Sequence, residues 1–324
     1  MKGLLSLSNN DHKLPDVVIT EFIDEDIALE VLCNFNVHYD PKLVDDQNQL
    51  YEMLPKARAL IVRNRTQVNE ELLKLAPNLK VVGRLGVGLD NIDLKACKNH
   101  KVIVCPATGA NDVAVAEYTI TAALILMRRA WHSSEAIIDG GWPRTNLMGR
   151  EISGKSMGLI GFGSIAREVA ERSKALGMEV FAYDPYLPAN DPAWSDVHKA
   201  DAKFDLAENC DVISIHVPYT NKTHQLIDAN FINKMQSGAI LINTARGGIV
   251  DESALIKALS EEKLRGAALD VFEDEPLSSE HRNLFKDIPN LILTPHIAGI
   301  TKEANERVSL LTAQNVVTNL SSKF

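Results

Sequence analysis

The sequence has little of what marks secreted, membrane-spanning or nucleic-acid-binding proteins. It holds four cysteines in 324 residues, none in CxxC spacing, so we expect no disulfide framework, no metal site and a reducing cytoplasm. No apolar run reaches the roughly 20 residues that span a bilayer, and residues 1–15 lack the basic-then-apolar order of a signal peptide. A net charge of −9 argues against a surface for nucleic acid or anionic membranes.

What the sequence does have is an alternation of short Val- and Ile-rich runs with helical patterns. Such alternation predicts βαβ units and a parallel sheet. In the first part of the chain, strands are expected at residues 17–19, 37–39, 59–62, 81–83 and 102–104, and helices at 24–32, 69–75 and 93–98. This part is therefore predicted to form a compact α/β domain.

A second series follows a long, Ala-rich helix that is expected at residues 112–129 and that we predict to join two domains. Its strands are expected at 156–160, 179–183, 212–216, 239–243, 267–271 and 291–294. Six parallel strands match a doubly wound nucleotide-binding domain. A final helix is expected at 301–320, after a break at Gly299.

A glycine-rich turn lies between the first strand of this second series and the helical pattern that follows it. Gly161, Gly163 and Ala166 form the pattern Gly-x-Gly-x-x-Ala. The first glycine permits a tight turn, the second lets the backbone approach a pyrophosphate, and the small third residue lets helix and strand pack closely. The pyrophosphate would lie on the N–H groups at the helix N-terminus. Taken alone, this motif is weak evidence for a dinucleotide site.

Asp184 strengthens the motif because it ends the next expected strand, where an acidic residue accepts hydrogen bonds from the adenosine ribose. Its carboxylate would repel a 2′-phosphate, and no Arg or Lys follows between Pro185 and Pro192. NAD is therefore favoured over NADP. The alternative is a solvated Asp before a turn.

Three loops that follow expected strands carry residues suited to hydride transfer. Arg246, before two glycines, can grip a carboxylate and polarise the neighbouring carbonyl. His296, between Pro295 and Gly299, can act as the general acid and base. Glu275 could orient His296 and stabilise its imidazolium, although spacing cannot show that the two side chains meet. Taken alone, an Arg such as Arg246 is more often part of a surface ion pair, and a single His such as His296 more often has a structural or surface role.

These motifs, in this order, resemble the D-isomer-specific 2-hydroxyacid dehydrogenase family over most of the chain. The matching stretches are Val62–Thr66, Gly83–Asp93, Ala114–Glu117, the glycine loop, His216–Pro218, and the Arg246, Glu275 and Pro295-His296 loops. The formate dehydrogenase branch of the superfamily is less similar, since it pairs its His with a Gln. Glu275 therefore favours the acid/base branch.

The resemblance implies two Rossmann-like domains: a flavodoxin-like substrate domain, residues 1–110 and 298–324, and a doubly wound NAD-binding domain, residues 111–297, inserted in it. The active site would lie in the cleft between them, with Arg246, Glu275 and His296 catalytic. The substrate carboxylate would bind at the backbone of Val87 and Gly88. The residues implied at the cofactor are Gly161, Phe162, Gly163, Ser164, Ile165, Asp184, Pro185, His216, Val217, Pro218, Thr220, Thr244, Ala245, Asp270 and Gly299.

Arginines on the substrate side bear on which acid is bound. Arg63, Arg65, Arg84 and Arg144 are more positive charge than a plain keto acid needs, since unpaired guanidinium groups are costly to bury. We therefore expect a C3 acid with a second anionic group, as in the 3-phosphoglycerate and sulfolactate dehydrogenases of the family. The alternative is that Arg63 and Arg84 are common to the family and pair with acids such as Asp90, which would suit a glyoxylate or hydroxypyruvate reductase.

Two further expectations concern partners. Trp142 to Arg144 lie in the region through which the family dimerises, so a homodimer is expected. Some members of the superfamily are NAD-sensing corepressors. The complete set of catalytic residues does not exclude that role, but the absence of basic patches and long disordered tails counts against it.

Overall fold

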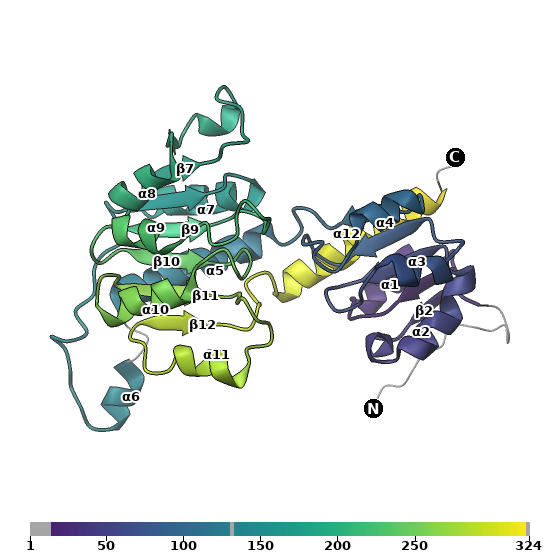
Figure 1. The fold of residues 1–324 in the computed structure, drawn as a ribbon, viewed down its shortest axis with the longest axis horizontal. Helices are drawn as coiled ribbons and strands as arrows, with labels where there is room; N and C mark the ends of the chain where they lie inside the picture. The colour runs from purple at the N-terminus through teal and green to yellow at the C-terminus, as the bar shows by residue number, and fades with distance from the viewer. Residues whose placement is uncertain (1–13, 130–132, 322–324) are drawn as a thin grey trace. The chain divides into compact units, whose positions relative to one another are not determined.

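The computed structural model describes residues 14–129 and 133–321 of the chain. They form two compact units, each with its own parallel sheet (Figure 1). Unit 1 takes the chain up to Asn111 and again from Ile300 onward, and unit 2 is Asp112–Gly299. The sequence placed the boundaries after residues 110 and 297, one and two residues earlier.

Unit 1 has a five-stranded sheet in the order β2-β1-β3-β4-β5, the flavodoxin-like arrangement. Its strands are β1 (Val17–Ile19), β2 (Val37–Tyr39), β3 (Ala59–Val62), β4 (Val81–Arg84) and β5 (Ile103–Pro106). Its α-helices are α1 (Glu25–Val31), α2 (Gln47–Met53), α3 (Glu70–Leu75), α4 (Leu94–Asn99) and α12 (Lys302–Ser321), with short 3-10 turns at Leu43–Asp45 and Leu54–Lys56. The flavodoxin-like fold implied by the resemblance is confirmed.

Both faces of the unit 1 sheet are covered because its strands are apolar on both sides. In β3, Leu60 packs toward α2, α3 and α4, whereas Ile61 packs toward α1 and α12. Helix α12 approaches β4 closely: a Cβ on Gly83 would lie 2.8 Å from Val316 and 2.9 Å from Thr312. Fully burying one such Leu or Ile contributes about 1.5–3 kcal/mol.

Unit 2 has a seven-stranded parallel sheet in the order β12-β11-β10-β9-β6-β7-β8. The strands are β6 (Ser156–Ile160), β7 (Glu179–Tyr183), β8 (His198–Lys199), β9 (Val212–Ile215), β10 (Ile240–Asn243), β11 (Gly266–Leu269) and β12 (Leu291–Leu293). The chain reverses its direction across the sheet between β6 and β9, and ligands of such sheets bind at the carboxyl ends beside that point. The doubly wound prediction is confirmed, with one strand more than expected.

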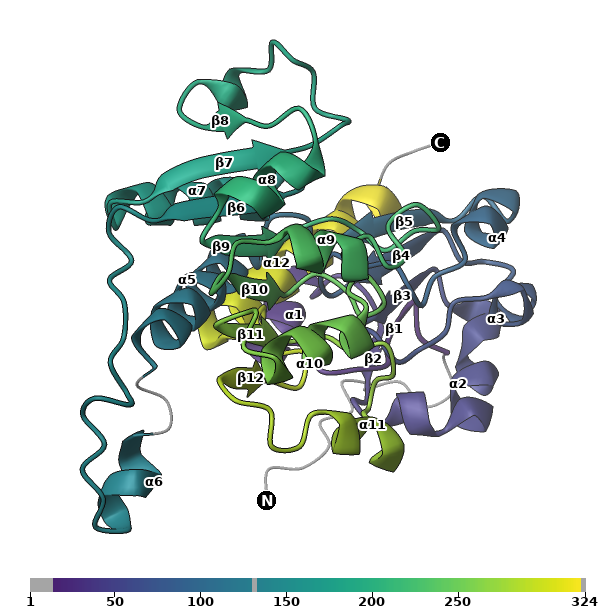
Figure 2. The same cartoon turned by 60° about the vertical axis from the view of Figure 1, so that its left-hand side comes forward.

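Helices pack on both faces of this sheet (Figure 1, Figure 2). Helices α8 (Lys203–Asn209), α9 (Ala229–Lys234) and α10 (Glu252–Ser260) share one core with Ile160 and Ile213, and α5 (Asp112–Arg128) and α7 (Ser164–Ala175) share the other with Leu159. The remaining helical segments are α6 (Ser133–Ile138), α11 (Ser279–Leu284) and a 3-10 turn at Pro192–Trp194. The α5 helix lies wholly in unit 2 rather than between the units.

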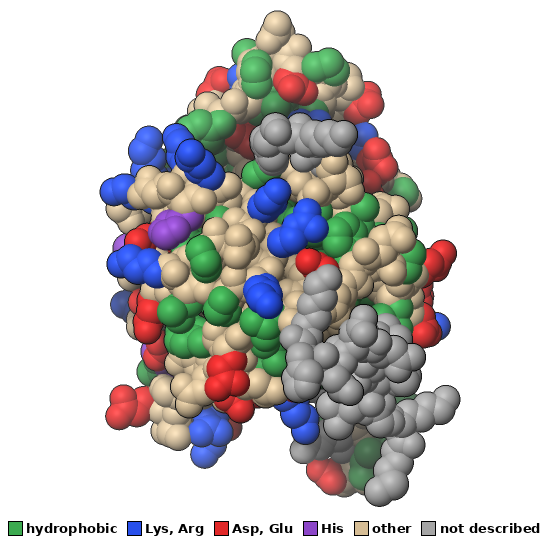
Figure 3. Space-filling view, turned by 90° about the vertical axis from the view of Figure 1, so that its right-hand side faces the viewer, with side chains coloured by type: hydrophobic (Ala, Val, Ile, Leu, Met, Phe, Trp, Pro, Cys, Tyr) green, Lys and Arg blue, Asp and Glu red, His purple; other side chains and the backbone are tan. Residues whose placement is uncertain are grey.

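The surface carries charges of both signs. On the face drawn in Figure 3, Lys and Arg side chains are interspersed with Asp, Glu and uncharged residues. Among the described residues, no helix is both long enough and apolar enough to cross a membrane.

Candidate active site

The glycine loop joins β6 to α7 at the carboxyl edge of the unit 2 sheet. Gly161 has φ +87°, and a Cβ there would lie 2.8 Å from the carbonyl oxygen of His216, so only glycine fits. Gly163 precedes α7 without a side-chain cap, and apart from its two chain neighbours no described residue has an atom within 4 Å of where its Cβ would be. Open space before uncapped helical N–H groups fits a pyrophosphate.

Asp184 directly follows β7, where the motif predicts it, and its carboxylate also shapes the glycine loop. One oxygen accepts a hydrogen bond from the N–H of Phe162 at 3.0 Å. The other accepts from the N–H groups of Tyr186 at 2.9 Å and Leu187 at 3.2 Å. Asp184 therefore ties together the ends of β6 and β7, the two strands that flank the proposed adenosine side.

His216, Val217 and Pro218 follow β9 and close the other side of the glycine loop. The His216 Nε2 lies 2.9 Å from the Ser214 hydroxyl, and burial lowers the pKa of His216 to about 4. This ring is therefore neutral at physiological pH. The Thr220 N–H donates to the hydroxyl of Thr223 at 2.7 Å, which holds the turn that follows.

Arg246 lies in the loop after β10, and Asn243, the last residue of that strand, shapes the loop. The Asn243 side chain accepts from the N–H of Ala245 at 3.0 Å and donates to the carbonyl of Arg246 at 2.9 Å. The guanidinium of Arg246 donates to the Ala245 carbonyl at 2.6 Å. A Cβ on Gly247 would lie 1.7 Å from the Phe272 carbonyl oxygen, so only glycine lets this loop approach the one after β11.

Glu275 and His296 meet, which spacing alone could not show. The Glu275 Oε2 lies 2.7 Å from the His296 Nδ1, and its Oε1 accepts from the Phe272 N–H at 3.0 Å. Burial would raise the pKa of Glu275, but these hydrogen bonds and the nearby charges of His296 and Arg246 bring it below its ordinary value. The three predicted catalytic residues are thus neighbours at the ends of β10, β11 and β12.

Asp270, directly after β11, is 1% exposed and holds the His296 loop in place. Its carboxylate accepts from the N–H groups of Ile297 and Ala298, each at 2.8 Å, and from the Thr294 hydroxyl at 2.6 Å. Sequence reasoning named Asp270 only as a cofactor contact and did not single out Thr294. The signal available in the sequence was an Asp directly after an apolar strand.

Other residues expected at the cofactor lie along the same carboxyl edge. The Thr244 hydroxyl, after β10, is buried and has no hydrogen-bond partner among the described residues, as expected of a group that a ligand satisfies. Of the other residues expected at the cofactor, Ser164 and Ile165 begin α7, Pro185 follows Asp184, Ala245 lies in the Arg246 loop, and Gly299 lies in the loop after β12. Open space at Gly163 and an orphaned hydroxyl at Thr244 together show that the residues present fit a dinucleotide.

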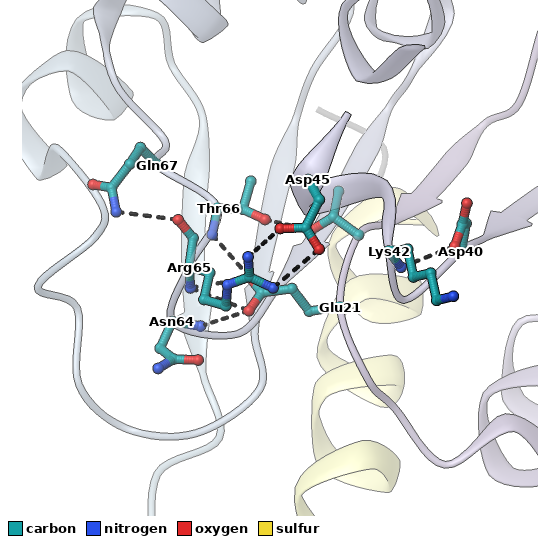
Figure 4. A network of polar contacts seen from close by, with 9 residues as sticks. Glu21, Asp40, Lys42, Asp45, Asn64, Arg65, Thr66 and Gln67 are labelled. Atoms are coloured by element: carbon teal, nitrogen blue, oxygen red, sulfur yellow. Dashed lines mark hydrogen bonds and ion pairs between the residues drawn. The ribbon is translucent and has the colours of Figure 1, made fainter. Parts of the chain in front are cut away.

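In unit 1, the loop after β3 is wrapped around the carboxylate of Glu21, which is 4% exposed (Figure 4). Four successive backbone N–H groups donate to it at 2.9–3.3 Å, from residues 63–66. Burial would raise the pKa of Glu21, and these donors bring it below its ordinary value. Glu21 was missed from the sequence. It fixes the backbone that carries Arg63 and Arg65.

The arginines of unit 1 have partners within the unit. Arg65 is exposed and forms a two-pronged ion pair with Asp45 (Figure 4). Arg63 donates to Asn305 of α12 at 2.9 Å and lies over the Phe22 ring. Arg84 folds back and donates to the Leu85 carbonyl at 2.9 Å.

Three further predicted substrate contacts lie elsewhere. Val87 and Gly88 follow β4 and are half-buried. Arg144 is exposed on the segment that leads from α6 into β6, and it is not one of the residues in the loops at the carboxyl edge that carries Arg246. Among the described residues, no cluster of His, Cys, Asp and Glu is arranged to hold a metal ion.

Comparison with known proteins shows which family this chain is similar to. Residues 120–298 match the family model described as D-isomer specific 2-hydroxyacid dehydrogenase, NAD binding domain. The chain is 49% identical over 303 residues to (S)-sulfolactate dehydrogenase of Chromohalobacter salexigens, covering 94% of this chain and 97% of that one. It is 38% identical to hydroxypyruvate reductase of Thermotoga maritima, covering 85% and 89%.

A third relative is longer, and two solved structures share the fold. D-3-phosphoglycerate dehydrogenase of Archaeoglobus fulgidus is 39% identical over 93% of this chain, which spans only 56% of that protein. The structure of D-lactate dehydrogenase from Aquifex aeolicus with NAD and lactic acid has a TM-score of 0.80 and 30% identity, covering 94% and 95% of the two chains. The TT0316 protein from Thermus thermophilus has a TM-score of 0.82 and 31% identity, covering 94% and 96%.

Proposed function

Because the chain belongs to the D-isomer-specific 2-hydroxyacid dehydrogenase family, we propose that it uses Arg246, Glu275 and His296 to oxidise and reduce a three-carbon acid with a second anionic group. The protein is an NAD-dependent oxidoreductase that acts on a CH–OH group. The observation that carries the catalytic assignment is the 2.7 Å contact between Glu275 and His296. Arg246 lies near this pair, and its positive charge contributes to the lowered pKa of Glu275.

His296 moves the proton in this proposal. Its Nδ1 is committed to the ionised Glu275 and so carries a hydrogen in the neutral ring. Its Nε2 then has a lone pair that can accept the hydroxyl proton of the 2-hydroxy acid. NAD, when bound at the glycine loop, would supply the acceptor for the hydride from C2. In reduction, the protonated Nε2 returns that proton to the carbonyl oxygen. Glu275 stabilises the imidazolium between the two steps.

Arg246 and the backbone of Val87 and Gly88 are the proposed ligands of the substrate carboxylate. A guanidinium can hold a carboxylate with two parallel hydrogen bonds and orient the adjacent C2 carbon. Asn243 keeps the Arg246 loop in one conformation, so this grip costs little ordering when the substrate arrives.

The second anion is proposed to bind Arg65. Arg63 is committed to Asn305 and Phe22, whereas Arg65 is exposed and is held by an equally exposed carboxylate, Asp45, with which an incoming anion can compete. A sulfonate is favoured over a phosphate because the relative named sulfolactate dehydrogenase is 49% identical over 97% of its length. Sulfolactate and sulfopyruvate are therefore the proposed pair, with phosphate and plain keto acids as the alternatives.

A substrate panel tests this proposal. With NADH fixed, sulfopyruvate should be reduced with a kcat/KM at least about tenfold above that of 3-phosphohydroxypyruvate, hydroxypyruvate, glyoxylate and pyruvate. No turnover of any of these would contradict the enzyme assignment. A preference for pyruvate or glyoxylate would contradict the second anion alone.

Arg65→Gln should raise the KM for sulfopyruvate about tenfold or more while the kcat/KM for pyruvate is kept, since only the former uses the second anion site. Asp45→Asn should have the opposite effect and lower that KM, because it removes the competing carboxylate. Equal losses on both substrates in Arg65→Gln would show that Arg65 holds the fold rather than the anion.

A homodimer in the cytoplasm is proposed as well. The segment from α6 to residue 150 projects from the rest of unit 2 (Figure 1, Figure 2) and exposes Ile138, Trp142 and Met148 to 82%, 74% and 69%. Exposed apolar side chains grouped in this way suit a second copy of the chain, and Arg144 would then act in the partner's site.

The cysteines support the cytoplasmic location. Burial raises the thiol pKa of Cys97 to about 11 and of Cys210 to about 12, as expected of unreactive cysteines that stay reduced.

A further inference from the structure

The backbone of His296 is held in an unusual conformation. Its φ is +57°, in the left-handed region, which costs a residue other than glycine roughly 1–2 kcal/mol. This conformation persists only where neighbouring contacts maintain it. Here the His296 N–H donates to the carbonyl oxygen of Asp270 at 2.8 Å, and the next two N–H groups, of Ile297 and Ala298, donate to the Asp270 carboxylate.

The carboxylate of Asp270 is in turn held by a chain of two hydroxyls. The Thr294 hydroxyl donates its single proton to Asp270 Oδ1 at 2.6 Å. Tyr118 lies 2.5 Å from the same Thr294 oxygen. Because the proton of Thr294 is already committed to Asp270, Tyr118 must be the donor in that contact. A directed chain of hydrogen bonds therefore runs from Tyr118 through Thr294 to Asp270.

This chain links two elements far apart in sequence. Tyr118 belongs to α5, which packs on the opposite side of β10 and β11 from α10, and Thr294 directly follows β12. The helix thus contacts the loop through the hydroxyl of Tyr118. Charge-assisted hydrogen bonds to a buried carboxylate are about twice as strong as neutral ones, which makes this link effective.

We propose that Tyr118 and Thr294 are positioning residues that keep the left-handed His296 loop, and hence the His296–Glu275 pair, in the geometry needed for proton transfer. The proposal rests on the catalytic role proposed above for His296. Neither hydroxyl contacts His296 itself in the hydrogen bonds described; both act through Asp270.

The electrostatics of Asp270 support the same role. Burial raises the pKa of Asp270, and the hydrogen bonds from Thr294, Ala298 and Ile297, with the nearby charge of His296, oppose that rise. Removing the Thr294 donor leaves a buried carboxylate with fewer partners. Such a group costs free energy, and a loop rearrangement that reaches His296 is the expected response.

The test compares Thr294→Val, Thr294→Ser and Tyr118→Phe in the full chain with NADH and the best substrate of the panel. Thr294→Val should lower kcat about 10- to 100-fold, as small misplacements of catalytic groups do, with the Kd for NADH kept within about twofold. Thr294→Ser should restore most of the rate because it keeps the hydroxyl. Tyr118→Phe should lower kcat by a smaller factor, about three- to tenfold.

Thr119→Val is the matched control. Thr119 is buried beside Tyr118 on α5 and bonds only the Val115 carbonyl among the contacts described, so the same substitution there should leave kcat near wild type. Proton NMR gives a second readout: the His296 Nδ1 proton, shared with Glu275, should give a downfield resonance that Thr294→Val shifts or broadens and Thr119→Val does not.

A double-mutant cycle separates this inference from the proposed function. In a His296→Gln background, Thr294→Val should change the residual kcat by less than about twofold, since residues that act as a unit are not additive. Full additivity, or a wild-type kcat in Thr294→Val alone, would overturn the inference. A near-normal kcat in His296→Gln alone would instead overturn the catalytic assignment.

Discussion

At the scale of single residues, His296 is a side chain with its two nitrogens assigned different tasks. The Nδ1 faces Glu275, and the Nε2 is the nitrogen proposed to face the substrate oxygen. A histidine that transfers protons needs one nitrogen free for the substrate, whereas a structural histidine can use both nitrogens in hydrogen bonds within the protein. It gives two predictions, one for each partner in the pair.

His296→Gln should lower kcat by two or more orders of magnitude and keep NADH affinity, because glutamine cannot exchange the proton. Steady-state kinetics and NADH titration by fluorescence measure both quantities. His281→Gln is the matched control, since His281 also pairs with an acid, Asp274, at 3.1 Å, but contacts none of the three proposed catalytic residues in the contacts described. A loss of rate in both variants would argue against a specific role for His296.

Glu275→Gln tests the pairing through stability rather than rate. The pKa of Glu275 is below its ordinary value of 4.5 in the folded protein, so the pair stabilises the fold fully above pH 4.5 and less as the pH falls through the lowered folded pKa. The difference in Tm between wild type and Glu275→Gln should therefore be largest above pH 4.5 and shrink on further acidification. A difference that grew with acid would contradict the pairing.

At the scale of elements, each loop that carries a proposed catalytic residue is anchored by a nearby buried polar side chain. Asn243 holds the Arg246 loop, and Asp270 holds the His296 loop. Glu252, at the start of α10, accepts from the Glu273 N–H at 2.9 Å and so holds the loop of Glu275. Buried polar groups of this kind order loops that have no regular structure.

Gly247→Ala should separate the loops after β10 and β11, because the added Cβ would overlap the Phe272 carbonyl. We expect kcat to fall about a hundredfold, with a lower Tm. Gly154→Ala is the control: Gly154 has φ +72°, and no described atom lies within 4 Å of where a Cβ would be, so it should cost about 1–2 kcal/mol of stability with kcat kept. Similar kinetics for the two variants would show that the loops tolerate separation.

The sequence predicted elements with strong apolar patterns and missed those without. Expected helices at 24–32, 69–75 and 93–98 begin one residue later, because Asp24, Asn69 and Asp93 are N-caps whose side chains accept from the first helical turn. Strand β8 was missed since both of its residues are polar and exposed.

For the site, the proposed catalytic residues were singled out by motif, but the residues that anchor their loops were not. Thr294 has no spacing signature, because its partners, Asp270 and Tyr118, come from other segments of the chain. Glu21 acts on residues more than 40 positions away, a distance over which no local pattern operates. Contacts of this kind depend on topology, which periodicity alone does not determine.

At the scale of the whole molecule, the three proposed catalytic residues belong to unit 2, whereas Arg65 and the Glu21 loop belong to unit 1. The proposed chemistry and the proposed choice of acid are thus carried by different units. Substitutions in the Arg65 loop should accordingly change which acid is preferred without changing the reaction catalysed.

Ile138→Asp tests the proposed homodimer. A charge on a side chain that is 82% exposed should not disturb the fold but should prevent an apolar interface, so light scattering should show a monomer where the wild type is a dimer. Leu94→Asp, at a residue 51% exposed in unit 1, should leave the dimer intact. A wild-type monomer at micromolar concentration would refute the proposal.

The split of unit 1 into two stretches, with Asp112–Gly299 between them, matters during synthesis on the ribosome. Strands β1 to β5 emerge early, but α12, which covers one face of their sheet, follows only after the whole of unit 2 is made. At roughly 5–20 residues per second, that delay is about ten to forty seconds. For that time Ile61 and its neighbours lack the helix that buries them, and the nascent chain offers chaperones an apolar sheet face.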